Sequence, residues 1–446
     1  MEVCLKKFVA LLFVCGASLA LAQDTPTTST EQNAPLQNAH DNMLTSLAGS
    51  FFQGDFFNVY AFFNGVYDST NQTLQGNRGG GAGYSLGGGI TGSKRFSNGS
   101  LSVNYRGDYR NYSSGFEGSG TNQYLSLAYT RRLGNRWTVS LSESAGILFY
   151  NNPFYTTLAP AGGGIQTNPF SPTTRFLQSS IYMSYRQTRR LSYTLGGSFF
   201  LNRYNYPGSI GTTGGIFSAS ASYTLTARTT VGGTYSHDNF YFQKSFGDTN
   251  IDGGYADVSH IFGRDWRVSV SAGVTRAHTQ GVINLPVNFI LGGAQPGAPA
   301  ISGYIQERYN TVSFVPTVQG SLTHQLGQFS LTASAGRGVN PGNGTYLTST
   351  HTYFGGSVSR KVGRQAIVTG NTYYSRITSI ANQVSGAYTQ NYTTIGYSRV
   401  LFPHVSAYAS YSYDRYGSLL SYSSSADNRF IGGISFSSKS IPFTLF

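Results

Sequence analysis

The feature that most constrains the fold is an alternation of apolar and hydroxyl side chains, which recurs through the last third of the chain. In residues 328–340 one set of alternate positions holds Phe329, Leu331, Ala333 and Ala335, and Ser, Thr and Gly fill the other set. Residues 404–416 repeat the pattern. Because successive side chains of a strand point to opposite faces, each run has an apolar face and a hydroxyl-bearing face. The pattern predicts strands with lipid on one side and water on the other.

Composition argues against a set of soluble domains, although 446 residues could form two or three of them. Charged residues make up only 11% of the chain, too few to cover a water-soluble exterior. Gly numbers 56, Tyr 33 and Phe 30, and this composition favours strands over helices. After the first 22 residues no run of 18 apolar residues occurs, which excludes helical membrane spans.

The first residues predict export. Lys6 and Lys7 precede an apolar stretch at residues 8–20, and Ala20-Leu21-Ala22 supplies the small residues of a cleavage site. Residues 1–22 are therefore predicted to be a secretory signal peptide, with a retained anchor as the alternative. Both cysteines of the chain, Cys4 and Cys15, lie in this segment. The exported chain thus has no thiol for a disulfide, a metal or a nucleophile.

An exported chain with amphipathic strands and no spanning helix is expected to form a closed barrel. In hydrocarbon every backbone polar group must be paired, and closure pairs them without leaving a sheet edge. We predict an all-β fold with one transmembrane antiparallel barrel over residues 55–438, of about 18 strands, with 16 as the neighbouring count. A polar lead at 23–54, which could enter the lumen, and a short end at 439–446 flank it.

Short and long connections alternate along the chain, which assigns the two ends of the barrel. The tight connections are predicted to be periplasmic; they lie at residues 134–135, 189–190, 263–264, 327, 363 and 403. The longer ones are predicted to be extracellular; they lie at residues 68–82, 151–174, 280–305, 379–388 and 417–427. Aromatic and basic residues gather beside the tight connections, as expected at a membrane interface; examples are Trp137, Trp266, Phe262, Phe402, Arg136, Arg190 and Arg360.

The chain ends at Phe446, and alternate aromatic and small residues precede it in a predicted last strand; these are Phe430, Gly432, Ile434 and Phe436. With the features above, residues 55–446 resemble a Gram-negative outer-membrane β-barrel of porin-like size. The resemblance implies an outer-membrane location, contact with outer-membrane lipid and lipopolysaccharide, and insertion by the barrel-assembly machinery. Porins are often trimers, so a homo-trimer is the assembly that the resemblance suggests, although no interface is evident in the sequence.

The lumen is expected to be lined by small hydroxylated side chains; the candidates are Ser140, Ser142, Ser144, Ser218, Ser220, Ser222, Ser269 and Ser271. The connection at 151–174 resembles the loop that narrows the channel of classical porins. A constriction built from it would be aromatic and neutral, with Phe154, Tyr155, Phe170 and, at its end, Arg175. Such a constriction would favour small neutral solutes such as sugars. A position on the rim is the alternative for this loop.

These observations predict a porin-like channel for passive diffusion of small hydrophilic solutes. Two alternatives stay open: a structural or exopolysaccharide-export barrel, and a surface-binding protein that uses its outer loops. A formal net charge of +13 favours mild anion preference, but no nucleic-acid recognition module is visible. We predict no enzymatic activity. His237-Asp238 has no recognisable second acidic partner nearby, and His404-Val405-Ser406, although it resembles the His-x-Ser of an outer-membrane phospholipase, lies beside a tight periplasmic turn, the wrong side of the membrane for that chemistry.

One segment matches the first half of a calcium-binding loop, with alternate oxygen-bearing side chains before a glycine. Its candidate ligands are Asp248, Asn250, Asp252 and the nearby Asp257. The bidentate glutamate of such loops is missing, because Ser259 occupies its place. A polar turn is therefore the favoured interpretation, and no cofactor is expected apart from this weak calcium candidate.

Overall fold

The computed structural model describes residues 56–72, 78–112, 119–149, 173–205, 210–243, 247–263, 265–289, 301–340, 348–363, 365–380, 387–418 and 423–438. The predicted signal peptide (1–22), lead (23–54) and C-terminal end (439–446) lie outside these ranges. Within them, no helix has the length and apolarity needed to cross a membrane.

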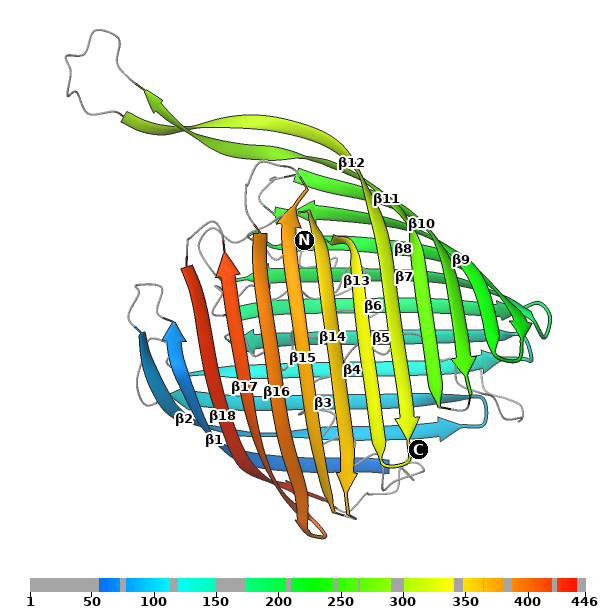
Figure 1. Ribbon diagram of the computed structural model, residues 1–446, viewed down its shortest axis with the longest axis vertical. Helices are drawn as coiled ribbons and strands as arrows, with labels where there is room; N and C mark the ends of the chain where they lie inside the picture. The colour runs from blue at the N-terminus through cyan, green and yellow to red at the C-terminus, as the bar shows by residue number, and fades with distance from the viewer. Residues whose placement is uncertain are drawn as a thin grey trace, which may run out of the picture.

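The described residues form 18 β-strands (Figure 1). Their bounds are β1 (Phe56–Gln72), β2 (Arg78–Phe96), β3 (Gly99–Tyr112), β4 (Ser119–Leu133), β5 (Trp137–Phe149), β6 (Thr173–Arg186), β7 (Leu191–Tyr204), β8 (Thr212–Thr226), β9 (Thr229–Phe242), β10 (Gly247–Phe262), β11 (Trp266–Phe289), β12 (Ile301–Leu326), β13 (Phe329–Asn340), β14 (Ser349–Val362), β15 (Ala366–Ser379), β16 (Ala387–Phe402), β17 (Val405–Ser418) and β18 (Ser423–Ser437).

The strands form one closed antiparallel barrel. Each strand pairs with its neighbours in the chain, and β1 also pairs with β18, from Tyr60↔Ser437 to Asp68↔Arg429. The ring therefore has no free edge along this seam, as backbone pairing in an apolar solvent requires. The prediction of a single all-β barrel with about 18 strands is confirmed, and the neighbouring count of 16 is excluded.

Tight connections join the strands at one end of the barrel, which we call the turn end, and the other end is the loop end. Four turn-end connections contain a glycine with a left-handed backbone: Gly134, Gly263, Gly327 and Gly363, with φ between 57° and 66°. A side chain at these positions would strain the turn, which explains why the sequence has glycine at these turns. All six tight connections predicted from the sequence lie at this end.

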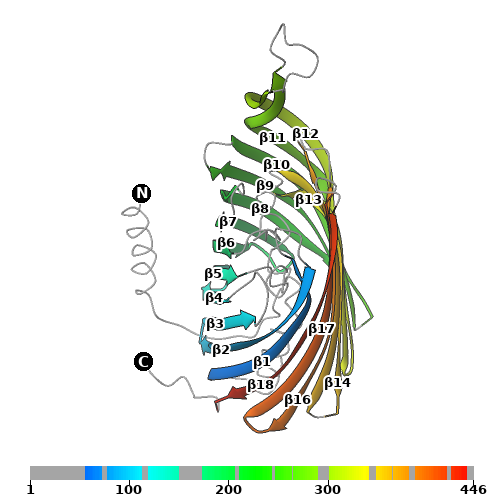
Figure 2. The same ribbon diagram turned by 90° about the vertical axis from the view of Figure 1, so that its left-hand side faces the viewer.

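One predicted long loop is corrected. Residues 280–305 were expected to form a connection, but β11 and β12 stay paired from Trp266↔His324 to Phe289↔Ile301. Only residues 290–300 separate the two strands. β10 stops pairing with β11 at Gly247↔Gly281, so the ribbon continues beyond the rim (Figures 1 and 2). Pro286 suggested a loop, but a two-stranded ribbon has open edges, where the missing N–H of proline breaks no ladder bond.

Two further predicted loops are shorter than expected. Pairing of β1 with β2 reaches Gln72↔Arg78, and pairing of β17 with β18 reaches Ser418↔Ser423. Strands of this barrel thus extend into Ser, Asn and Gly residues that resemble turn residues in the sequence. The predicted long connection at 151–174 lies outside the described residues, except for its last two positions.

Contacts between strands that are not neighbours show which face of the sheet points into the barrel. The Tyr408 hydroxyl of β17 donates to Asn64 Oδ1 of β1, across β18. The Arg106 guanidinium of β3 lies 4.7 Å from the ring centre of Phe62 of β1, across β2. Side chains converge only on the concave side of a curved sheet, so these residues face inward. The residue beside Phe62 faces outward: Phe63 is 54% exposed, whereas Phe62 is 1% exposed.

Candidate functional site

The candidate site is the inward wall of the barrel, followed around the ring by strand register. Residues paired across two strands share a face, so the inward assignment passes from β1 to every other strand. All eight serines predicted to line the lumen are inward by this criterion. The alternate residues of the same strands face outward, among them Leu141, Ala219, Ala221 and Val270.

The inward hydroxyls form continuous rows around the wall because the register brings them side by side. One row runs through Thr138, Ser184, Thr194, Ser220 and Thr234 on strands β5 to β9. A second row runs through Thr230, Ser259, Ser269, Ser321 and Ser334 on strands β9 to β13. These side chains are small and neutral, and they offer hydrogen-bonding groups beside one inward carboxylate, that of Asp257 on β10.

Several of these hydroxyls bond to each other across strands. Ser192 and Ser222 are 2.7 Å apart, Ser184 and Thr194 3.0 Å, and Thr130 and Ser140 3.3 Å. A hydroxyl has one donor and two acceptor lone pairs, so a single cross-strand bond leaves hydrogen-bonding capacity over. A polar solute at the wall can therefore exchange bonds with it at low cost.

Inward aromatic rings lie sideways over glycines of the adjacent strand. A Cβ built on Gly146 of β5 would lie 2.7 Å from the Phe176 ring of β6, and one on Gly214 of β8 would lie 2.7 Å from the Phe200 ring of β7. Each ring thereby reaches a second aromatic one strand further: Phe176 lies 6.1 Å from Tyr124, and Phe200 lies 5.5 Å from Phe240. Rings held in this way follow the wall.

A group of inward charged residues occupies strands β1, β3, β17 and β18. We call it the inward charge cluster; its members are Asp68, Arg106, Asp108, Arg110, Asp414, Asp427 and Arg429. Arg429 Nη2 lies 2.6 Å from Asp68 Oδ2 and 3.6 Å from Asp427 Oδ2. Asp108 lies between Arg106 at 4.0 Å and Arg110 at 3.9 Å, and accepts a hydrogen bond from Asn122 at 2.9 Å.

The inward charge cluster is nearly neutral and largely buried. It contains three arginines and four aspartates, and both Asp68 and Asp108 have only 2% of their side-chain surface exposed. A buried charge requires a partner, which the opposite charges here supply. The sequence analysis missed this group, although Arg106, Asp108 and Arg110 already alternate on one face of a predicted strand. The other members that pair, Asp68 of β1 and Arg429 of β18, are 361 positions apart in the sequence.

The structure corrects one residue of the predicted constriction. Arg175 pairs with Ile147 and Arg203, in register with the outward faces of β5 and β7, and its side chain is exposed. It therefore does not point into the lumen. The inward neighbours at this level are Thr174 and Phe176, both buried. Phe154, Tyr155 and Phe170 lie outside the described residues.

The predicted calcium ligands do not converge on one point. Asp248, Asn250 and Asp252 belong to the outward face of β10, whereas Asp257 is inward and accepts a hydrogen bond from Thr234 at 2.7 Å. They lie in a paired strand and not in the loop that the sequence suggested. In the part of the chain that the structure describes, no group of three or more His, Cys, Asp or Glu residues could hold a metal ion.

The two histidine pairs considered for catalysis are also separated. His237 faces outward and Asp238 inward, and Asp252 is the carboxylate beside His237, with 2.8 Å between Oδ1 and Nδ1. The Tyr235 hydroxyl also donates a hydrogen bond to Asp252 Oδ1 at 2.9 Å, and Arg276 Nη1 lies 3.8 Å from Asp252 Oδ2. His404 bonds the backbone oxygen of Ser437 at the turn end. Among the described residues, the partner of His237 is a carboxylate and that of His404 is a backbone oxygen, so neither histidine is paired with a hydroxyl nucleophile.

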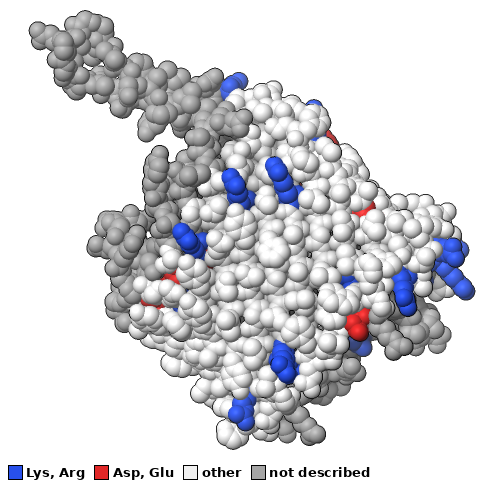
Figure 3. Space-filling model, viewed as in Figure 1, with Lys and Arg blue, Asp and Glu red and all other residues white. Residues whose placement is uncertain are grey.

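The outward wall is apolar between its two ends. Large apolar side chains are exposed on every part of it, for example Phe63, Leu195, Phe314 and Ile395 at 54%, 47%, 69% and 57%. Aromatic residues lie at the turn end. The ring centres of Trp137 and Tyr185 are 4.5 Å apart there, and those of Trp266 and His324, which stack, are 3.9 Å apart. Figure 3 shows basic residues near the two ends of the strands, with an uncharged band between them.

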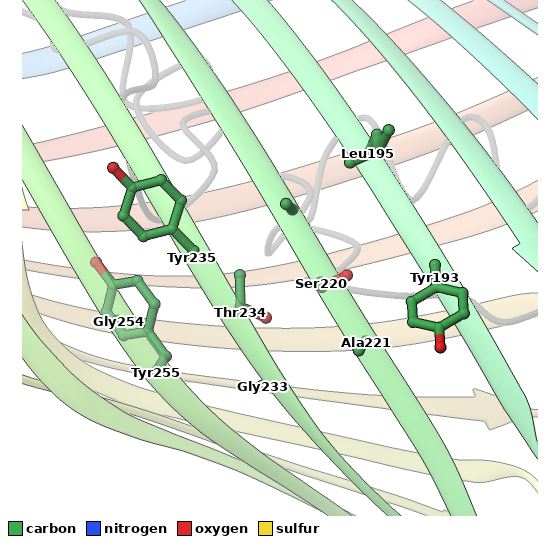
Figure 4. A pocket seen from close by; sticks show the side chains of 10 residues that line it. Tyr193, Leu195, Ser220, Ala221, Gly233, Thr234, Tyr235, Gly254 and Tyr255 are labelled. Atoms are coloured by element: carbon green, nitrogen blue, oxygen red, sulfur yellow. The ribbon is translucent and has the colours of Figure 1, made fainter.

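A shallow depression of about 500 Å³ interrupts the outward wall over β7 to β10 (Figure 4). It exists because small outward residues, Ala219, Ala221 and Gly233, lie between Tyr193 and Tyr235, and Gly254 lies beside Tyr235 on the next strand. Most of its lining residues are outward and apolar or small, although Ser220 and Thr234 of the first hydroxyl row also border it. We assign it to the packing of the outer surface and not to the candidate site.

Comparison with known proteins finds no matching family model and no matching curated protein. Among solved structures, the chain is similar to OccK2 (OpdF) of Pseudomonas aeruginosa, with 13% identity, a TM-score of 0.42, and coverage of 86% of this chain and 99% of that one. A BenF-like porin from Pseudomonas fluorescens Pf-5 has 11% identity and a TM-score of 0.44, with coverage of 87% of this chain and 99% of that one. OccAB4 of Acinetobacter baumannii has 8% identity and a TM-score of 0.41, with coverage of 86% of this chain and 98% of that one. The barrel assignment rests on the strand pairing of this chain itself.

Proposed function

We propose that this protein is a porin-like channel of the outer membrane through which small hydrophilic solutes diffuse passively. The observation that carries the proposal is the division of one closed ring of strands into an apolar outward face and a hydroxylated inward face. A protein surrounded by water would not expose so continuous an apolar surface. A membrane protein needs one, with charges confined to its ends.

The width of the ring supports a water-filled bore. Barrels of 16 to 18 strands are wide enough to leave an aqueous channel, unlike barrels of about eight strands, whose side chains fill the interior. The inward rings follow the wall, as those over Gly146 and Gly214 do, and the hydroxyl rows are made of short side chains. Diffusion through such a bore requires no turnover and no cofactor.

The chemistry of the wall supports a preference for uncharged, hydroxylated solutes. The three arginines and four aspartates of the inward charge cluster nearly neutralise each other and are buried, so they exert little net attraction on an ion in the bore. The hydroxyl rows of β5 to β13 replace hydrogen bonds that a sugar or similar polyol loses when it leaves bulk water. Liposome swelling should therefore be faster with neutral sugars than with ionic solutes of similar size.

Two neighbouring residues of β8 provide a test with an internal control. Ser220 is inward and Ala221 is outward. Cys4 and Cys15 lie in the predicted signal peptide, so Ser220→Cys or Ala221→Cys gives the exported chain a single thiol. In planar bilayers, a charged methanethiosulfonate reagent should change the single-channel conductance of the first variant only. A stable, inserted barrel that conducts no current would contradict the proposed function.

A further inference from the structure

Some basic residues at the turn end point into the barrel and not toward the membrane. Arg95 lies opposite Ser100, which shares the inward face of Arg106 on β3, and Arg132 lies opposite the inward Thr138. Each such residue is the last or next-to-last of its strand at this end, and each is exposed or half-exposed. We call this set the basic collar; its members are Arg95 (β2), Arg132 (β4), Arg186 (β6), Arg267 (β11) and Lys361 (β14).

Contact with lipid head groups accounts for the outward basic residues of the turn end but not for the basic collar. Lys94 and Arg131 are the outward neighbours of Arg95 and Arg132, so they can reach the membrane interface. Within four residues of the tight connections, the described part of the chain contains a single carboxylate, that of Asp265. The inward rim of this mouth therefore carries an excess of positive charge, which attracts a negatively charged ligand.

Three members of the basic collar form an arc on alternate strands. Adjacent strands are about 4.8 Å apart, so the arginines of β2, β4 and β6 are separated by about 10 Å across the sheet. Neutral residues fill the strands between them, with Ser100 opposite Arg95 and Thr138 opposite Arg132. Charges spaced in this way favour an extended ligand with several separated carboxylates over one small anion.

The chain itself contains a segment of this chemistry. Residues 23–54 include three carboxylates, of Asp24, Glu31 and Asp41, and no lysine or arginine. The segment joins the barrel at the same mouth, because Phe56 at the start of β1 pairs with Ser93 near the turn end of β2. A chain of about 15 residues, the separation of Asp41 from Phe56, reaches up to roughly 50 Å, and the tether raises the effective concentration of the carboxylates at the collar.

We propose that residues 23–54 dock on the basic collar as an extended acidic segment, with its carboxylates paired to the arginines of β2, β4 and β6. The chain thereby supplies the counter-charge of its own mouth, and the collar attracts few other anions. The inference rests on removal of the predicted signal peptide, which would otherwise place Lys6 and Lys7 before the segment. It does not require that the barrel conduct.

Zero-length crosslinking tests which amines the segment contacts, because a carbodiimide joins carboxylates directly to neighbouring primary amines. The purified exported chain is treated in detergent, and joined peptides are identified by mass spectrometry. Carboxylates of residues 23–54 should be joined to Lys361 and to the amine introduced by Arg132→Lys. The matched controls are the outward Lys94 and the neighbouring variant Arg131→Lys, which should give little or no joined product.

The inward crosslinks should be largely lost in about 1 M salt, where the screening length falls to about 3 Å. Equal crosslinking of inward and outward amines, or inward crosslinks that persist in high salt, would overturn the inference. A conducting barrel without the inward crosslinks defeats only the docking of the segment. A crosslinked barrel that carries no current defeats only the proposed function.

Ion selectivity provides a second measurement through reversal potentials in a salt gradient. Asp24→Asn/Glu31→Gln/Asp41→Asn should raise the anion-to-cation permeability ratio by about twofold or more, because it leaves the basic collar without its counter-charge. The same triple change should have no effect in a chain that also carries Arg95→Gln/Arg132→Gln/Arg186→Gln. An unchanged ratio in the first variant, or an equal rise in both backgrounds, would contradict the docking.

Discussion

Arg429 of β18 donates two hydrogen bonds to one carboxylate oxygen of Asp68 of β1, from Nε at 2.8 Å and from Nη2 at 2.6 Å. The two residues are 361 positions apart in the sequence and lie opposite each other across the seam where the barrel closes. The pair is buried, with Asp68 at 1% and Arg429 at 8% exposure. It therefore ties the first strand to the last at a point where only correct closure brings the charges together.

Arg429→Gln should destabilise the barrel by about 3–5 kcal/mol, because it leaves a buried carboxylate without its counter-charge. Urea unfolding in lipid vesicles, followed by loss of the compact band on an unheated gel, measures the change. Arg189→Gln, at an exposed turn, is the control and should have little effect. The double variant Asp68→Asn/Arg429→Gln should recover part of the loss. If Arg429→Gln lowers stability no more than the control Arg189→Gln does, the seam pair adds nothing to stability.

Gly87→Ala should destabilise the barrel by about 1–3 kcal/mol through overpacking. A Cβ at Gly87 would lie 2.5 Å from both the Phe62 ring and the backbone oxygen of Gly107. The ring would have to leave the glycine and its position under Arg106. Gly432→Ala is the matched control, because its Cβ meets no atom within 4 Å. The same unfolding assay should separate the two variants, and similar midpoints would contradict this account of the glycine.

Local alternation was sufficient to predict the strands, the turn-end glycines and the faces of residues such as Ser142 and Ser220. A strand side chain must point one way or the other, so periodicity alone carries that information. Arg106, Asp108 and Arg110 obey the same alternation and pair with each other, but Asp68 and Arg429 meet only where the first and last strands pair. Such long-range pairing leaves no trace in a local pattern, so the inward charge cluster was not predictable.

The extended ribbon and Arg175 show two other limits of sequence analysis. Proline usually ends a strand, but Pro286 pairs with Tyr304 in a ribbon whose edges are open. Arg175 comes directly after a predicted loop, and the sequence does not show whether its side chain points inward or outward. Its pairing with Ile147 and Arg203 in the structure shows that it points outward. A shift of one residue reverses every side chain of a strand, so predictions at strand ends are the least secure.

Glu143→Leu should stabilise the barrel in a lipid bilayer by about 1–2 kcal/mol, since a carboxylate on the lipid-facing side costs free energy there. Glu143 lies on the outward face of β5, midway between Trp137 and Phe149, with Leu127 and Ser179 as its cross-strand neighbours. Among the described residues it is the only charged side chain between the two ends of this wall. Ser179 is its hydrogen-bond partner.

Ser179→Ala should have the opposite effect on stability, because it leaves the carboxylate without that hydrogen bond. Unfolding of both variants in the same vesicles provides the comparison. If Glu143→Leu lowers stability and also abolishes a slow-migrating oligomer on native gels, the outward face of β5 contacts protein and not lipid.

Removal of residues 283–307, with an Asn-Gly turn joining Val282 to Arg308, should leave barrel stability unchanged within about 0.5 kcal/mol. The deleted segments of β11 and β12 pair with each other, whereas β10 ends its pairing at Gly281 and β13 at Val318. No other described strand depends on them. Single-channel conductance should also be retained, because the ribbon continues beyond the rim.

A deeper deletion of residues 275–315, closed by the same turn, is the control for this truncation. It removes the partners of β10 from Gly247 to Gly253 and should destabilise the barrel by several kcal/mol, because those backbone groups would face hydrocarbon unpaired. If the shorter deletion already lowers the unfolding midpoint as much as the deeper one, the ribbon supports the barrel wall. If it changes only the conductance, the ribbon acts at the channel mouth.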